Sequence, residues 1–220
     1  MAWSRYEHLV FFGVRSPMTV EFEETCRRLD RPVLAGVSRG GSARAVLTAV
    51  IVDDPPDTAT HYLPCAFEPG RRRALSADAE TLGLAPADAL IDPTAVVAAS
   101  SSTGEGSFVN AGAVIGGATI LGRCVLVNRA ASVGHHCVLE DFATIGPGAT
   151  LTGGIRLGMG ATVGAGAVLL PGIAVGEGAL IAAGSLVRED VAAGAFVAGS
   201  PAVERPFDRA RSKLFAAGEE

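Results

Sequence analysis

Aromatic residues are scarce in this chain, at 5% of its 220 residues, and charged residues make up only 19%. The hydrophobic content of 49% excludes a disordered chain. Because aromatic residues are few, we expect a core built mainly from small aliphatic side chains. No apolar run approaches the ~18–20 residues that span a bilayer, and residues 1–14 lack the order of a signal peptide. We therefore expect a cytoplasmic protein without a membrane span.

Basic patches and paired cysteines are missing too. The net charge of −5 and the pI of about 5.4 do not suit a nucleic-acid backbone, so no nucleic-acid partner is expected. The single basic run, 71–73, predicts a solvated turn or the start of a helix. We expect free thiols in a reducing compartment, because no paired spacing links the four cysteines, Cys26, Cys65, Cys124 and Cys137.

Residues 1–86 have the pattern of a small α/β, Rossmann-like domain. Short apolar runs predict strands, charged amphipathic runs predict helices, and the strand–helix–strand order predicts a parallel sheet. The expected strands are 8–13, 33–37 and 62–67, the expected helices are 20–29 and 71–82, and 38–42 is expected to be a loop. The state of the apolar segment 45–52 stays open.

From Ile91 onward the sequence repeats with a period of six. Every sixth residue up to Val187 is Val, Ile or Leu, with the one exception of Thr103. Four residues after most of these positions comes a small side chain, and three residues after the later ones comes Gly. The register never slips, which excludes an inserted loop over nearly a hundred residues.

A strict period of six fits neither a helix nor a flat strand. It predicts very short strands joined by regular turns, in which three hexads close one triangular coil of eighteen residues. Stacked coils place each aliphatic residue above its equivalent, and Gly serves turn positions with positive φ. We expect this β-helix to fill 87–202, followed by a tail, 203–220, in which 204–217 forms a short amphipathic helix that caps the last coil.

The hexads resemble those of left-handed β-helix acyltransferases, and the left-handed crossover is taken from that resemblance. The small α/β domain, the segment "LIDPTAVV" (90–97) and a late "GSPA" (199–202) narrow it to the sialic acid O-acetyltransferase and UDP-amino-sugar N-acetyltransferase family. The resemblance implies a mainly β protein that moves an acetyl group from acetyl-CoA to a sugar or UDP-sugar. It also implies a homotrimer and no metal.

The segment 127–147, "VNRAASVGHHCVLEDFATIGP", resembles the catalytic coil of that family. The matching histidine is His135, which the resemblance makes the general base, and imidazole suits this role because it changes charge near neutral pH. His136 stands where the family usually has Asp or Glu. Three alternatives stay open. His136 accepts a hydrogen bond from His135 as a neutral ring, or Glu140 or Asp141 supplies the negative charge in its place. In the third alternative His136 is a turn residue that faces solvent or a neighbouring subunit.

Other site residues also follow from the resemblance. Asn128 matches a family Asn near the base, although Asn is equally suited to a tight turn. Gly153 matches a position whose N–H faces the developing oxyanion. The acetyl-CoA positions, in a groove between two subunits, are Thr144, Gly164, Ala165 and Ala183. The repeat itself also demands several of these Gly and Ala residues.

The N-terminal domain departs most from the family, whose first strand is followed by a Gly-rich turn that cradles phosphates. This chain keeps Gly13 but lacks the later glycines. Either Arg15 and Ser16 bind phosphate at a helix N-terminus, or the domain no longer binds a nucleotide.

Two other functions compete with acetyl transfer. A zinc enzyme of the carbonic anhydrase type needs three His ligands, and the repeat offers only His135 and His136. A β-helix that has lost catalysis and serves as a binding scaffold is the second. No nucleophilic Cys or Ser is expected, because Cys137 occupies an inward position.

Overall fold

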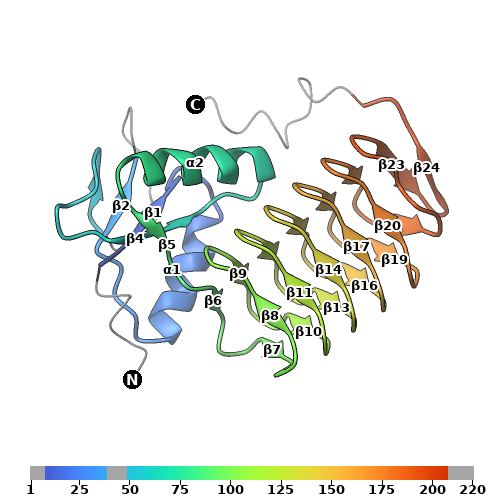
Figure 1. Ribbon diagram of the computed structural model, residues 1–220, viewed down its shortest axis with the longest axis horizontal. Coiled ribbons are helices and arrows are strands. Elements are labelled where there is room, and N and C mark those ends of the chain that lie inside the picture. Colours follow the sequence, from blue (N-terminus) through green and yellow to red (C-terminus); the bar gives the residue numbers. More distant parts are fainter. Residues whose placement is uncertain (1–7, 39–48, 208–220) are drawn as a thin grey trace.

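The computed structural model describes residues 8–38 and 49–207. The predicted loop residues 39–42, the segment 45–48 and most of the predicted C-terminal helix, 208–217, lie outside these residues. The described chain has two parts, a small sheet with two helices and a long β-solenoid that extends away from it (Figure 1).

The N-terminal part is a parallel sheet in the order β3-β2-β1-β4-β5. Its strands are β1 (Leu9–Phe12), β2 (Ala35–Val37), β3 (Ile51–Val52), β4 (His61–Pro64) and β5 (Ala85–Pro86). The helices are α1 (Thr19–Arg28) and α2 (Pro69–Thr81). All five predicted elements are confirmed within a few residues, and β3 and β5 are additional. Helix α2 begins where the Glu68 side chain accepts hydrogen bonds from the N–H groups of Gly70 and Arg71.

Most strands of the solenoid have two residues, and they form three sheets in which all strands except β24 (Ala202–Glu204) run parallel to one another. Sheet I contains β7 (Val96–Val97), β10 (Val114–Ile115), β13 (Ser132–Val133), β16 (Thr150–Leu151), β19 (Val168–Leu169) and β22 (Leu186–Val187). Sheet II contains β8 (Ser102–Thr103), β11 (Ile120–Leu121), β14 (Val138–Leu139), β17 (Arg156–Leu157) and β20 (Ala174–Val175). Sheet III contains β6 (Leu90–Ile91), β9 (Phe108–Val109), β12 (Leu126–Val127), β15 (Thr144–Ile145), β18 (Thr162–Val163), β21 (Leu180–Ile181), β23 (Phe196–Gly199) and β24 (Ala202–Glu204).

The predicted coil of eighteen residues is confirmed by the strand register. Val114 pairs with Ser132 and Ser132 pairs with Thr150, each eighteen residues on. The second residue of most strands is buried, and so are the small residues four positions later, which together form one continuous core. The three turns of a coil are called corner I–II, corner II–III and corner III–I, after the sheets that they join.

The turns differ from the prediction in one stretch. Glycine occupies the left-handed turn position in the later coils, as expected, with Gly154 at φ 71°. In the middle coils the same position holds Ala118, Cys124, Ala130, His136 and Phe142, with φ between 52° and 62°. A left-handed non-glycine residue costs roughly 1 kcal/mol, and the stacked coils hold it there.

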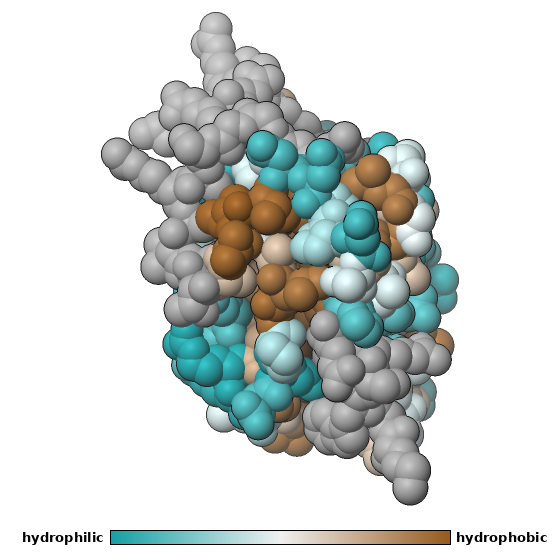
Figure 2. Space-filling view, turned by 90° about the vertical axis from the view of Figure 1, so that its left-hand side faces the viewer, coloured by the Kyte–Doolittle hydropathy of each residue, from teal (hydrophilic) through white to brown (hydrophobic). Residues whose placement is uncertain are grey.

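The N-terminal domain packs on the outer face of sheet III. The outward residues Leu90, Phe108 and Leu126 are buried in a cluster with Phe11 and Phe22 of the domain. Phe22 stacks on Phe108 with ring centroids 4.1 Å apart. Figure 2 views the molecule from the end where this domain lies, and its described surface there mixes apolar and polar groups.

Polar contacts fix the domain to the coils at several heights. The buried carboxylate of Asp92 accepts hydrogen bonds from Thr25 and Arg28 of α1. The carboxylate of Glu80 on α2 pairs with Arg123, which also donates to the Tyr62 hydroxyl at 2.8 Å.

Arg72 contradicts the expectation that the run 71–73 is solvated. The helix start is confirmed, but Arg72 is 1% exposed, because its side chain turns into the junction between α2 and sheet III. Its guanidinium there donates to carbonyl and hydroxyl oxygens of both parts.

The end of the solenoid also differs from the prediction. Residues 204–207 are not helical. Glu204 instead belongs to β24, which pairs antiparallel with β23. A paired strand satisfies the open edge of sheet III, which is the task that the predicted helix was expected to perform. No helix in the described ranges 8–38 and 49–207 is long and apolar enough to cross a membrane.

Candidate active site

His135 lies at corner I–II, in the turn that follows β13. Its side chain is exposed, as predicted for an outward position of the coil. The neighbouring coils place Gly117 and Gly153 at the equivalent turn position, so small residues flank the ring on both sides. The ring therefore stands on a surface that a second molecule can approach closely.

His136 forms a direct pair with His135. Their Nδ1 atoms are 2.9 Å apart, and the two rings meet edge to face with centroids 5.1 Å apart. In such a pair one Nδ1 carries the proton and the other accepts it. If His135 donates, its Nε2 carries the lone pair, and within the described residues Nε2 has no hydrogen-bond partner.

Gly153 lies directly against the His135 ring. A Cβ atom added at Gly153 would lie 2.6 Å from Cε1 and 2.8 Å from Nε2 of His135. Among the hydrogen bonds of the described residues, none uses the N–H of Gly153. A free backbone donor thus lies beside the imidazole, as the resemblance implied for an oxyanion site.

Neither acidic candidate lies next to the imidazole pair. Glu140 and Asp141 belong to corner II–III, which follows β14. Asp141 accepts from the backbone N–H of Arg123 at 2.8 Å, and Glu140 accepts from the N–H of Met159 at 3.1 Å. Within one chain, the prediction that either carboxylate supplies the charge for His135 is therefore wrong, because consecutive turns lie at different corners.

Asn128 is buried at corner III–I and lies at a different corner from His135. Its Oδ1 accepts from the N–H of Arg129 at 2.8 Å and from the Asn110 side chain at 3.1 Å. Its Nδ2 lies 3.8 Å from the Sδ of Met18, in the turn before α1. These contacts are those of a turn-forming Asn that also touches the domain carrying the predicted acceptor turn.

An apolar cavity of about 320 Å³ lies along corner III–I, and Phe67 of the N-terminal domain also lines it. Three residues predicted to bind CoA, Gly164, Ala165 and Ala183, line it together. Ala165 and Ala183 are exposed, and in the described part of the chain their N–H groups donate to no other group. Small side chains with open amides suit a ligand that carries amide groups of its own.

Thr144 lies on sheet III behind this cavity. Its side chain is fully buried, accepts from the Arg72 guanidinium at 2.8 Å and donates to the carbonyl of Phe67 at 3.1 Å. Its hydroxyl is thus engaged within the chain, and its predicted contact with CoA stays a prediction.

The turn after β1 lines a second, smaller cavity. Gly13 has φ 85°, and a Cβ there would lie 2.4 Å from the side chain of Leu75 on α2. Gly13 and Arg15 line a cavity of about 140 Å³ together with Ser38 and Arg71. Ser16 lies just before α1, and its hydroxyl accepts from the N–H of Met18 at 3.3 Å. Two of the three predicted acceptor residues thus share one cavity.

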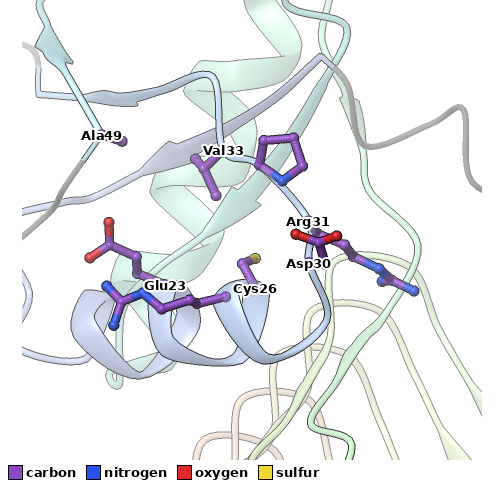
Figure 3. A pocket seen from close by; sticks show the side chains of 8 residues that line it. Glu23, Cys26, Asp30, Arg31, Val33 and Ala49 are labelled. Atoms are coloured by element: carbon purple, nitrogen blue, oxygen red, sulfur yellow. The ribbon is translucent and has the colours of Figure 1, made fainter.

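A third cavity, of about 460 Å³, lies along α1 and carries no catalytic arrangement. Figure 3 shows Glu23 and Cys26 projecting from α1 toward the segment of Val33. Burial raises the pKa of Cys26 to about 12, so this thiol stays protonated at neutral pH. Cys137 is buried as predicted, and burial also raises its pKa. Over residues 8–38 and 49–207, no group of three His, Cys, Asp or Glu side chains is placed to hold a metal ion.

Sequence reasoning missed three aromatic residues of the apolar cavity. Phe67, Phe196 and Phe207 line it beside the small residues, and Phe196 stacks on Phe207 with centroids 4.5 Å apart. Phe67 belongs to the N-terminal domain, and the other two follow the last hexads. The hexad pattern contains no signal for any of them.

Solved structures that superpose on this chain include a nucleotide-sugar N-acetyltransferase and an acetyltransferase domain. GDP-perosamine N-acetyltransferase from Caulobacter crescentus, solved with CoA and GDP-perosamine, superposes with a TM-score of 0.84 at 27% identity, over 90% of this chain and 97% of its own. Variants with one histidine replaced are among its structures. The acetyltransferase domain of PglB from Neisseria gonorrhoeae, with acetyl-CoA, gives 0.81 at 28% identity, over 90% and 98% of the chains. WeeI from Acinetobacter baumannii, at 22% identity and 0.74, shares the fold. No protein-family model matches the sequence, and no curated protein does.

Proposed function

We propose that this chain, which is an acetyltransferase of the hexapeptide-repeat type, moves the acetyl group of acetyl-CoA onto the amino group of a nucleotide-linked amino sugar. The enzyme class is the one that the sequence resemblance predicts and that the neighbours at 27–28% identity support. The observation that carries the proposal is the exposed His135 imidazole beside Gly153. Within residues 8–38 and 49–207, its Nε2 and the N–H of Gly153 have no hydrogen-bond partner.

The reaction needs one base and one oxyanion donor. The amine of the acceptor attacks the thioester carbonyl while Nε2 of His135 takes its proton. The carbonyl oxygen gains negative charge, and in this proposal the N–H of Gly153 stabilises it. The carbon–sulfur bond then breaks, the proton passes from His135 to the sulfur, and CoA leaves as the thiol. No covalent enzyme intermediate is required.

His136 takes the place of a carboxylate in this scheme. A neutral His136 accepts a hydrogen bond from the Nδ1–H of His135, which fixes the tautomer with Nε2 unprotonated and holds the ring in place. It stabilises the imidazolium through a hydrogen bond but without a negative charge. The geometry of the pair supports this role, which the departure from the family had left open.

The donor fits the apolar cavity at corner III–I. Pantetheine is a narrow chain with two amide groups, and the open N–H groups of Ala165 and Ala183 match its carbonyl oxygens. The walls formed by Phe67, Leu180 and Phe196 exclude water from the thioester arm.

The base and the donor cavity lie at different corners of one chain. Sheet I separates corner III–I from corner I–II. One side of the coil has six residues, and each adds up to about 3.3 Å to the distance between the two corners. Sheet I also exposes apolar side chains, with Val96 at 62% and Val114 at 43% exposure. We propose that a neighbouring copy in a homotrimer covers this face and brings its His135 to the cavity of the first chain.

The acceptor binds near corner III–I, on the side of the N-terminal domain. Gly13 and Arg15 line their cavity, while Met18 from the same turn contacts Asn128 at corner III–I. The guanidinium of Arg15 and the N-terminus of α1, which follows Ser16, offer positive charge to a diphosphate. The nucleotide thus anchors the sugar near the groove that holds the donor.

Blocking the cavity tests the position of the donor. The substitution Ala183→Trp is expected to raise the KM for acetyl-CoA at least ~10-fold, because the exposed Ala183 side chain lines the cavity and an indole would fill it. Steady-state kinetics with varied acetyl-CoA provide the measurement. Ala99→Trp is the matched control, since Ala99 is an exposed turn residue at corner I–II of the first coil. Equal effects of the two variants would place the donor elsewhere.

Mixing two impaired variants tests the shared site. Co-expression of His135→Ala with Ala183→Trp is expected to restore about a quarter of the wild-type activity, because mixed trimers contain sites built from two intact halves. The measurement is thiol release by the whole co-expressed protein at an acetyl-CoA concentration well below the KM of Ala183→Trp, compared with each variant alone. Mixed trimers without activity would show that His135 and the cavity of one chain serve the same reaction.

A further inference from the structure

Arg72 connects the helix of the acceptor domain to the wall of the donor cavity. Six hydrogen bonds join its guanidinium to neutral oxygens: the carbonyls of Ala66, Phe67, Cys124, Phe142 and Ala143 and the hydroxyl of Thr144. The shortest of these, to Phe67 and Phe142, are 2.6 Å. The side chain thereby holds the end of the N-terminal sheet and two coils in one arrangement.

A buried guanidinium without a carboxylate partner among these contacts is costly. Burial lowers the pKa of Arg72 to about 10, so the group remains charged at neutral pH. Desolvation of a charge is offset here only by hydrogen bonds to dipoles. We therefore expect the Arg72 guanidinium to fix the position of one of the segments whose oxygens it binds.

Phe67 lies in that segment. The carbonyl of Phe67 accepts hydrogen bonds from Nη1 of Arg72 at 2.6 Å and from Oγ1 of Thr144 at 3.1 Å. Phe67 also lines the apolar cavity, together with Gly164 and Ala183. Phe67 lies outside any helix or strand, in the connection between β4 and α2. Without these two donors nothing regular would fix its position over the groove.

We propose that Arg72, together with Thr144, is a positioning residue that holds Phe67 as the wall of the acetyl-CoA cavity and thereby sets the affinity for the donor. This inference rests on the proposed function. Thr144 then acts on the donor through Phe67 rather than by touching it. Because Leu75 and Arg71 of the same helix line the cavity at Gly13, α2 spans the donor and acceptor sites.

The test compares donor affinity with acceptor affinity. Arg72→Lys is expected to raise the KM for acetyl-CoA roughly 10–100-fold. Thr144→Val is expected to raise it roughly 3–10-fold, because the Phe67 carbonyl then loses one of its two hydrogen bonds. The KM for the acceptor should change less than about threefold. Thr144→Ser retains the hydroxyl and should restore the wild-type value. Calorimetric titration with CoA gives the same ranking without turnover, and Thr144→Val serves if Arg72→Lys fails to fold.

Arg123→Lys is the matched control, because Arg123 also joins α2 to a coil, through Glu80, without contacting Phe67. A role in docking alone predicts equal effects of Arg72→Lys and Arg123→Lys on donor affinity, and that result would overturn the inference. So would a Thr144→Val variant with unchanged CoA affinity. If the wild-type protein itself does not bind CoA, the proposed function fails together with the inference.

Discussion

Replacement of His135 by alanine is expected to lower the rate of acetyl transfer by roughly 10²–10⁴-fold, the usual contribution of a positioned general base. The loss should appear in kcat, because His135 lies at corner I–II and does not line the donor cavity of its own chain. Its ring is exposed and stands in a turn, so the fold and the thermal midpoint should change little.

The measurement is thiol release at saturating acetyl-CoA and acceptor, with thermal unfolding as the control for folding. His136→Ala is the matched neighbour. It removes the hydrogen bond to Nδ1 of His135 but leaves the base, so a smaller loss than for His135→Ala is expected. A His135→Ala variant that retains more than about a tenth of the wild-type kcat would remove the base from the scheme.

The substitution Gly153→Ala is expected to reduce kcat on the order of 100-fold through displacement of the base. The added methyl would lie 2.6 Å from Cε1 of His135, which forces the ring to move, and misplacement by about 1 Å can cost this much. The backbone of Gly153 does not have a positive φ, so alanine fits its conformation. The affinity for CoA and the stability should stay near the wild-type values.

Gly117→Ala is the matched control for this variant. Gly117 occupies the same turn position one coil earlier, and a Cβ there would meet only the Ser100 hydroxyl, at 3.1 Å. The comparison uses kcat and CoA affinity of both variants. If Gly153→Ala retains full activity, the ring of His135 does not work where it lies against Gly153.

The interior of the solenoid was predictable because one simple rule governs it. An aliphatic residue every sixth position and a small residue four later fill the same triangular section in each coil, so the period alone gives strands, register and core. The outward-facing residues of sheet III follow a period of eighteen, which the period of six does not reveal. Leu90, Phe108 and Leu126 recur every eighteen residues on sheet III, and this apolar column is where the N-terminal domain packs.

The site was predictable where a residue acts from its own turn. His135 and Gly153 lie in equivalent turns of adjacent coils, so their approach follows from the register. The surroundings depend on contacts between distant segments, which no local pattern encodes. Arg72 looked like part of a solvated basic run, and only the packing of α2 on sheet III shows that it is buried against Cys124 and Phe142. The alternative that Glu140 or Asp141 supplies the charge does not hold within one chain, because these residues lie at the next corner of the coil and their side chains accept hydrogen bonds there.

The roles proposed for His135 and for the donor cavity depend on transfer of acetyl groups from acetyl-CoA to a nucleotide-linked amino sugar. The most direct measurement is free-thiol release from acetyl-CoA with a panel of GDP- and UDP-linked amino sugars, with mass spectrometry of the acceptor. The account predicts thiol release with at least one of them, matched by a gain of one acetyl group on the sugar nitrogen. Absence of turnover across the panel, combined with no detectable binding of CoA, would contradict it and leave the solenoid as a binding scaffold.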